Sequence, residues 1–399
     1  MVTSAAVTIS VSGAAAATTS AITDEFVTRL AERAREAEEL RRLPDATMTD
    51  LAASGFTELL TPARFGGQQA DFPALLDPVR RMAHGCASSA WTIGFLALHN
   101  WMLALFGEQA QAEAYATRPF LAPAPLAPNG RGLPTEGGVR LSGRWSWATG
   151  VMHANWIMVG ALCGPDDAIY PALALLPASD IEIVDVWHTD GMRATGSNDV
   201  VVTDAFVPEH RLVSVIDVYT GTAPGAKVHD AATYRWPMVP ALALLAAMPA
   251  LGSAERAVEI YAQRLSERVI AYEGVKQKDK PAAVAHLGEA RVRLRALRGL
   301  TADTVGEIED TVTAGDPVSR EVRAQARLAA AHIVRESRAV IALLLASSGA
   351  SAHFLDNPLQ RISRDVGVLS GHVIFDHDTS CELAGALSIG MRISPIAMI

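Results

Sequence analysis

The stretch Asp190–Ser197, which reads DGMRATGS, decides how the rest of this chain is interpreted. It is followed by the β-branched run Val200–Val202 and then by Phe206-Val207-Pro208. The glycines and small hydroxyl residues favour a turn, the valines favour a strand, and the proline favours its end. We therefore expect a loop that could hold a flat polar ligand at the mouth of a β-domain, with Thr195 and Ser197 as candidate contacts.

The segments on either side of this β region have a helical pattern. Helical spacing of apolar residues begins after Thr23, a candidate N-cap, and continues to about residue 120. Proline and glycine then crowd residues 123–134, and short β-branched runs follow. Four long helical runs return at 236–254, 283–299, 317–347 and 359–389. We predict an N-terminal helical domain (23–120), a central β-barrel or sandwich (121–230) and a C-terminal four-helix bundle (231–399).

The composition narrows the class of protein. The net charge is -9 and no basic stripe is present, which argues against nucleic acid as a partner. The three cysteines lack CxxC spacing, so we expect a reducing compartment and no disulfide framework. Residues 1–22 lack the positive start of a secretory signal and are predicted to be a disordered leader. The uncharged runs 236–254 and 339–355 are predicted to be buried helices rather than membrane spans, in a cytoplasmic protein.

Two segments resemble the acyl-CoA dehydrogenase fold. The region around residues 190–208 is similar to its "W…GLRAT.S..V.F.DV.VP" pattern, and residues 51–67 are similar to "L…GF..LL.P.RFGG". The helix–β–helix order is also that of the family, so the resemblance covers nearly the whole chain after residue 24 and implies an α+β fold. One branch of the fold dehydrogenates acyl thioesters, and another hydroxylates aromatic compounds with reduced flavin and oxygen.

The segment after Arg364-Asp365 separates the two branches. Acyl-CoA dehydrogenases need a carboxylate base, which commonly follows this Arg-Asp pair in a YEGT-like segment. Here no carboxylate occurs before Asp376, and His372 stands in its place. This pattern resembles the oxygenase components of two-component flavin monooxygenases, such as 4-hydroxyphenylacetate 3-hydroxylase and dibenzothiophene monooxygenase. The resemblance implies that His372 deprotonates the substrate or binds a C4a-hydroperoxide. Taken alone, His372 could equally be a core histidine.

The segment 143–156, GRWSWATGVMHANW, is similar to the "G.W.F.SG...A.W" signature of these oxygenases. The resemblance implies that Thr149 contacts the N5 edge of the flavin, where its hydroxyl can donate a hydrogen bond or steady a peroxide. Thr149 could also be an ordinary strand residue. Trp145 and Trp147 could flank the isoalloxazine or only pack the β-domain.

The candidate substrate pocket lies on another helix. Residues 86–92, CASSAWT, resemble the SSAW element of the oxygenases, which places Trp91 at the pocket. His99 follows two turns later on the same face. In the oxygenases that this helix resembles, a histidine reaches the substrate, so the resemblance makes His99 a secondary catalytic and substrate candidate; it could also be a surface or interface histidine. Asn129 could line the pocket, but Asn-Gly is first of all a turn signal.

Arg268 is the candidate for the flavin phosphate. The resemblance places a phosphate-binding arginine near this position, often directed to a neighbouring subunit's flavin, and a guanidinium suits bidentate phosphate contact. No metal site is expected, because His372, His377 and Glu382 stand five residues apart rather than at the helical i, i+4 spacing.

The resemblance implies an oxidoreductase, the oxygenase component of a two-component flavin-dependent monooxygenase that acts on an aromatic or polycyclic small molecule. No Rossmann motif follows a strand, so reduced FMN or FADH2 would come from a separate reductase, with O2 as co-substrate. A homotetramer is expected from the family. Two alternatives stay open: an acyl-CoA dehydrogenase with FAD and a displaced base, and a non-catalytic flavin-binding homologue.

Overall fold

The N-terminal region is a group of short helices around one long one. The computed structural model describes residues 22–269, 274, 276–394 and 397–399. The helices are α1 (Asp24–Glu32), α2 (Ala34–Leu40), α3 (Asp45–Ser54), α4 (Leu76–Met82), α5 (Ala87–Leu103) and α6 (Glu108–Tyr115). Thr23 caps α1 as predicted, because its hydroxyl accepts a hydrogen bond from the Phe26 N–H at 3.2 Å.

The predicted leader, residues 1–22, is one residue too long. Ile22 is fully buried in the main core, and its carbonyl accepts a hydrogen bond from Arg81 Nη1 at 2.8 Å. Ile22 therefore belongs to the helical domain. The rest of the predicted leader, residues 1–21, lies outside the described residues.

The central region is a single seven-stranded sheet. Its strands are β1 (Gly130–Thr135), β2 (Gly138–Ala148), β3 (Trp156–Cys163), β4 (Tyr170–Pro177), β5 (Glu182–Val184), β6 (Asn198–Pro208) and β7 (Leu212–Ser214). The strand order is β5-β6-β2-β1-β3-β4-β7, antiparallel except between β1 and β3. This order has two end strands, so the predicted barrel or sandwich is not confirmed for the described residues.

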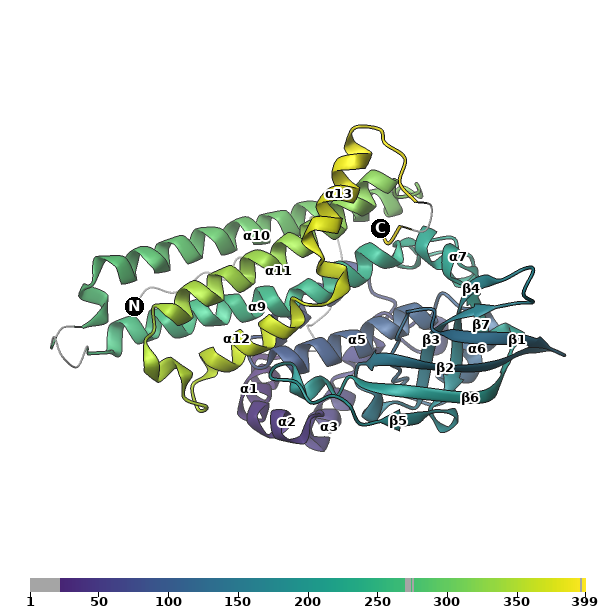
Figure 1. The fold of residues 1–399 in the computed structure, drawn as a ribbon, viewed down its shortest axis with the longest axis horizontal. Coiled ribbons are helices and arrows are strands. Elements are labelled where there is room, and N and C mark those ends of the chain that lie inside the picture. Colours follow the sequence, from purple (N-terminus) through teal and green to yellow (C-terminus); the bar gives the residue numbers. More distant parts are fainter. Residues whose placement is uncertain (1–21, 270–273, 275, 395–396) are drawn as a thin grey trace.

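The C-terminal region contains three long helices packed side by side (Figure 1). After the short α7 (Val215–Thr220) and α8 (Pro224–His229) come α9 (Met238–Glu267), α10 (Pro281–Thr313) and α11 (Arg320–Ala346). The predicted fourth helix, 359–389, is wrong as one element, because it is divided into α12 (Pro358–Leu369) and α13 (His377–Ser388). Asp376 starts α13 as an N-cap that accepts from the Thr379 N–H at 2.8 Å, and His372 lies in the break.

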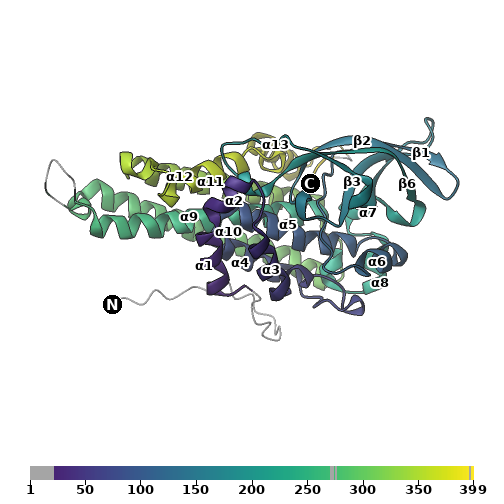
Figure 2. The same cartoon turned by 90° about the horizontal axis from the view of Figure 1, so that it is seen from below.

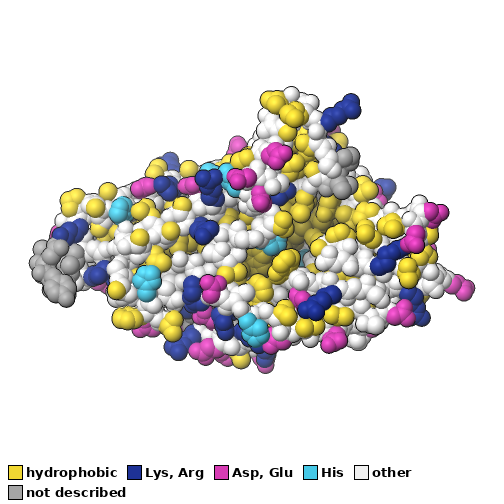
Figure 3. All heavy atoms as spheres, in the orientation of Figure 1, with side chains coloured by type: hydrophobic (Ala, Val, Ile, Leu, Met, Phe, Trp, Pro, Cys, Tyr) yellow, Lys and Arg dark blue, Asp and Glu magenta, His cyan; other side chains and the backbone are white. Residues whose placement is uncertain are grey.

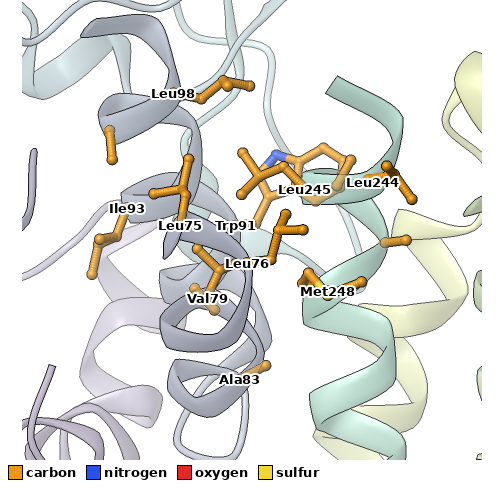
Figure 4. Close-up of a cluster of buried hydrophobic side chains, with 14 of the residues drawn as sticks. Leu75, Leu76, Val79, Ala83, Trp91, Ile93, Leu98, Leu244, Leu245 and Met248 are labelled. Atoms are coloured by element: carbon orange, nitrogen blue, oxygen red, sulfur yellow. The ribbon is translucent and has the colours of Figure 1, made fainter. Parts of the chain in front are cut away.

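The molecule is elongated: the sheet forms one end, and the helices of the bundle extend from beside it to the other end. In Figures 1 and 2 the sheet occupies one end, the far ends of α9 and α10 occupy the other, and α5 lies between them beside the N-terminal helices. Nearly every side chain of α5 is buried. Figure 4 shows Trp91 of α5 among Leu76, Leu244 and Leu245, where α5 meets α9. Full burial of each such apolar side chain stabilises the fold by about 1.5–3 kcal/mol.

One helix among the described residues, α9, is long and apolar enough to cross a membrane. In its most apolar 18-residue window, 94% of the residues are buried inside the fold. The helix also contains Pro249. The neighbouring helices cover this surface, so α9 is a core helix, as predicted for residues 236–254.

Candidate active site

Two motifs that are far apart in the sequence meet at the junction of the sheet and the bundle. The Met192 N–H donates to Asp365 Oδ1 at 2.6 Å, across 173 residues of sequence. A Cβ on residue 191 would lie 2.2 Å from the Arg364 carbonyl oxygen, so only glycine fits there. The Arg364 guanidinium contacts Glu38 and the Asp190 carbonyl. Desolvation raises the pKa of the enclosed Asp365 to about 6, although the Met192 N–H opposes this shift.

A chain of hydroxyl groups starts at this junction. Thr195 Oγ1 donates to the Met192 carbonyl at 2.9 Å, and lies 2.7 Å from Ser197 Oγ. Ser197 Oγ lies 2.9 Å from Thr149 Oγ1, which accepts from Trp91 Nε1 at 3.4 Å. Thr195 and Ser197 are almost fully buried, whereas Thr149 is half-buried. The structure therefore brings together three residues that were predicted to contact the flavin. Thr149 is the most accessible of them, and Ser197 and Thr195 are buried behind it.

The direction of the protons in this chain follows from its last acceptor. Each hydroxyl has one proton, and that of Thr195 is used on the Met192 carbonyl. Ser197 then donates to Thr195, and Thr149 donates to Ser197. Thr149 consequently keeps a lone pair for a ligand, whereas donation of its proton was one of the two roles considered from the sequence.

The two tryptophans of β2 have different environments. Trp145 is fully buried and donates from Nε1 to the Gly160 carbonyl at 2.7 Å, so it packs the β-domain. Trp147 is 69% exposed and has φ +65° at a register shift between β2 and β6. A bulky residue in this region costs about 1–3 kcal/mol, and such strain concentrates at functional sites. Trp147 is therefore available to cover a flat ligand.

A row of aromatic rings connects the two candidate histidines. The ring centroids of His372 and Trp91 are 5.7 Å apart, those of Trp91 and Phe95 are 4.8 Å apart, and those of Phe95 and His99 are 5.6 Å apart. The half-buried Phe95 was not predicted, although it lies four residues after Trp91 and four before His99, on one face of α5.

The two histidines present opposite hydrogen-bonding groups. His372 Nδ1 accepts from the Ile374 N–H at 3.2 Å, which leaves its proton on Nε2. His99 Nδ1 donates to the Ala122 carbonyl at 2.5 Å, which leaves a lone pair on its Nε2. Burial lowers the pKa of His99 to about 4. Desolvation also lowers the pKa of His372. Both rings are neutral at neutral pH.

These residues surround a space that is open to solvent. His372 is exposed, and Phe95 and Thr149 are half-buried around Trp91. Figure 3 shows a hollow between α13 and the sheet, lined mainly by hydrophobic side chains and containing a histidine. An apolar hollow with a few directed polar groups is typical of small-molecule sites. The exposed Trp147 and the lone pair of Thr149 fit a reduced flavin, whose N5 carries a hydrogen.

Two predicted site residues lie elsewhere in the chain. Asn129 is exposed in a turn before β1, where its N–H donates to the Ala127 carbonyl at 2.7 Å. The β1–β2 register places this turn opposite Gly143, so it is about 20 Å along the sheet from Thr149. Asn129 therefore lies apart from Thr149, Trp91 and His372 of the same chain.

Arg268 is the C-cap of α9, at the end of the bundle away from the sheet (Figure 1). Its guanidinium contacts the Ser348 carbonyl, as does Arg264 Nη2 at 2.7 Å. Both arginines line an open recess of about 340 Å³. Arg268 therefore does not lie with Thr149, Trp91 and His372 of the same chain.

Comparisons with known proteins identify the family of this chain. Residues 14–119 match the family described as acyl-CoA dehydrogenase, N-terminal domain, and residues 244–377 match acyl-CoA dehydrogenase, C-terminal domain. The chain is 34% identical to the oxygenase subunit HsaA of a flavin-dependent monooxygenase from Rhodococcus jostii, over 93% of this chain and 98% of the relative. It is 28% identical to the oxygenase component of p-hydroxyphenylacetate 3-hydroxylase from Acinetobacter baumannii, over 93% and 89%.

Solved structures give the same assignment. The 3-HSA hydroxylase from Rhodococcus sp. RHA1 superposes with a TM-score of 0.90 at 34% identity, covering 94% of this chain and 97% of that one. XiaF from Streptomyces, in complex with FADH2 and glycerol, superposes with a TM-score of 0.86 at 27% identity, covering 94% of each. The chain belongs to the flavin-dependent monooxygenases of the acyl-CoA dehydrogenase fold, as an oxygenase component that uses reduced flavin and O2.

Proposed function

We propose that this oxygenase hydroxylates a phenolic, aromatic small molecule, which binds against Phe95 between the two neutral histidines. One observation carries this proposal. The aromatic rings of Trp91 and Phe95 lie between His372 and His99, and Nε2 is a hydrogen-bond donor in His372 but an acceptor in His99. A flat ring packs well on aromatic side chains. The lone pair of His99 Nε2 accepts from the phenol hydroxyl, and His372 Nε2–H donates to the oxygen that is transferred.

The reduced flavin supplies the activation of O2. The chain's own contribution is to hold and shield it. The lone pair of Thr149 accepts from the flavin N5–H, and Ser197 and Thr195 fix the orientation of that hydroxyl. Trp147 covers the isoalloxazine, and the apolar walls of the hollow exclude water. Oxidised flavin has no hydrogen at N5, so this arrangement favours the reduced form.

The chemical class of the substrate is supported by the relatives. Their names include hydroxylases of resorcinol and of p-hydroxyphenylacetate, from Rhizobium and Acinetobacter. For this chain we extend the class from single rings to polycyclic phenols, because the hollow is open to solvent and lined mainly by hydrophobic side chains (Figure 3).

The first experiment is to supply chemically reduced FMN or FADH2 and O2 with a panel of single-ring and polycyclic phenols. We expect hydroxylated product in stoichiometric yield from at least one phenol, and hydrogen peroxide alone from matched compounds that lack the hydroxyl. Peroxide alone from every phenol would refute the proposed substrate class.

The position of Arg268 adds a proposal on assembly. Arg268 ends α9 on the side of the bundle away from the sheet (Figure 1), and we infer that it does not serve the hollow of its own chain. We infer that Arg264 and Arg268 bind the phosphate of a flavin held by another copy, in a cytoplasmic homotetramer that receives this flavin from a separate reductase. Light scattering on Arg268→Ala should show an unchanged mass, and calorimetry should show weaker binding of reduced flavin.

A further inference from the structure

The connection Ser370–Asp376, which carries His372, is held by a buried arginine of the bundle. Arg327 of α11 is 3% exposed. Its Nη2 donates to the Val373 carbonyl at 3.2 Å, and its Nε donates to the Ile374 carbonyl at 3.3 Å. Its Nη1 donates to the Met398 carbonyl at 2.7 Å. One guanidinium therefore ties the turn after His372 to the 397–399 segment.

The same turn also fixes the imidazole. The Ile374 N–H donates to His372 Nδ1, while the Ile374 carbonyl accepts from Arg327. The Val373 carbonyl and the Ile374 N–H belong to the same peptide group, so Arg327 holds the peptide that sets the tautomer and the ring orientation of His372. Burial lowers the pKa of Arg327, and the nearby Asp376 opposes that shift, yet a guanidinium remains charged. Burying a cation is unfavourable unless its hydrogen bonds are satisfied, which the three carbonyls achieve.

The 397–399 segment covers the other side of this arginine. Ile399 is 2% exposed and packs with Ala324 of α11 and Ala384 of α13. This contact places the Met398 carbonyl against Arg327. A neighbouring arginine, Arg320, donates to the Ser394 carbonyl at 2.7 Å and makes no contact with the His372 turn that we find among the described residues.

We propose that Arg327 is a positioning residue that keeps His372 Nε2–H directed into the hollow, and that residues 397–399 fasten Arg327 in place. This proposal rests on the proposed function of His372. Without Arg327 the turn loses two carbonyl anchors, so the ring rotates more freely. Flavin still reacts with O2, but less of the oxygen reaches the substrate.

The first test uses flavin-free protein, so it does not depend on activity. Hydrogen exchange of peptides covering 370–376 is compared for wild type, Arg327→Gln, Arg327→Lys, a variant lacking 397–399, and the control Arg320→Gln. Local opening should make exchange about tenfold faster in Arg327→Gln and in the shortened variant, with an intermediate effect in Arg327→Lys. Arg320→Gln should match wild type, and peptides elsewhere should not change.

The second test measures product formed per flavin oxidised. Arg327→Gln should lower this ratio toward that of His372→Ala at an unchanged rate of flavin oxidation, and Arg327→Lys should restore part of it. Unchanged exchange and an unchanged ratio in folded Arg327→Gln would overturn the proposal. If that variant does not fold, the same two results in the shortened variant overturn it. If His372→Ala alone keeps the full ratio, the proposed role of His372 fails, and hydrogen exchange still decides the positioning.

Discussion

At the scale of the residue, the chemistry of the site depends on where single protons lie. The Met192 carbonyl orients Thr195, and this orientation passes through Ser197 to Thr149. The backbone likewise sets the two histidines, through the Ile374 N–H and the Ala122 carbonyl. The sequence predicts the hydroxyl and imidazole groups themselves. It could not predict their hydrogen-bonding direction, because that direction depends on the backbone conformation of the turns at Met192 and Ile374 and on the packing that brings the Ala122 carbonyl to His99.

Thr149→Ala should weaken binding of reduced flavin about tenfold, because one hydrogen bond to N5–H is lost at about 1.4 kcal/mol. Titration calorimetry under anaerobic conditions measures this change. Thr149→Ser keeps the hydroxyl and should bind like wild type. Wild-type affinity in the alanine variant would remove Thr149 from the flavin site.

The buried His99 should make the protein less stable in acid. Its folded pKa of about 4 lies below the unfolded value of about 6.5, so the unfolded state binds more protons between these values. Stability therefore falls as pH drops from 6.5 to 4, by about 3 kcal/mol from this residue. Urea unfolding of His99→Gln, which keeps an N–H donor, should show a shallower decline over this range. An identical decline in both proteins would contradict the pKa.

At the scale of the element, α4 and α9 are joined by a buried ionic cluster. The side chain of Glu255 on α9 is 7% exposed and pairs with Arg80 of α4. His84 Nε2 lies 3.1 Å from the same carboxylate, and Arg298 Nη1 of α10 lies at 3.5 Å. Desolvation opposes protonation of His84, but hydrogen bonds to Glu255 and Glu259 raise its pKa. Its stabilising charge is fully present below pH 6.5 and is lost as pH rises through the raised pKa.

Glu255→Gln should lower the free energy of unfolding by about 3 kcal/mol, because it removes the buried negative charge shared by Arg80, His84 and Arg298 and leaves Arg80 with Asp77 alone. Glu259 is the matched control on the same helix, since its side chain is 51% exposed. Glu259→Gln should change stability by less than about 1 kcal/mol. Equal effects of the two substitutions in urea unfolding would show that burial of the pair is unimportant.

The helices also show the limits of the sequence pattern. Apolar spacing predicts the three long bundle helices, because their buried faces repeat regularly. The break between α12 and α13 was missed, since apolar residues continue through Val373, Ile374 and Phe375. The break instead follows from the Asp376 cap and from the Arg327 contacts, and the latter exist only once α11 is packed beside it.

At the scale of the whole molecule, the junction of the sheet and the bundle is the part on which the site depends. The order of the three regions follows from the sequence and its family resemblance, whereas the contact between the Asp190–Ser197 stretch and Arg364-Asp365 is seen only in the structure. Distances along the sheet do not follow from the sequence, which is why Asn129 was considered together with pocket residues that lie far from it. For Arg268 the family resemblance had already pointed to a neighbouring subunit's flavin. Local signals such as Asn-Gly are short-range and carry no information on where a turn lies in the fold.

Gly191→Ala should separate the sheet from the bundle, since its Cβ would meet the Arg364 carbonyl at 2.2 Å. We expect a fall in stability of more than about 2 kcal/mol, as for other strained backbone sites, and faster limited proteolysis near residue 191. Gly367→Ala is the control within α12, where a Cβ meets nothing within 4 Å. It should stabilise the helix by about 0.5–1 kcal/mol. Equal melting temperatures of the two variants would exclude this role for Gly191.

The exposed position of Trp147 has an optical consequence. The other six tryptophans are buried or half-buried, so Trp147 alone emits from a largely aqueous environment. A flavin ring stacked on Trp147 would quench this emission, which lies at longer wavelength than that of the buried tryptophans. Trp147→Phe would remove the part of the fluorescence that the flavin quenches. The protein thus contains an intrinsic, label-free fluorophore at the proposed flavin site.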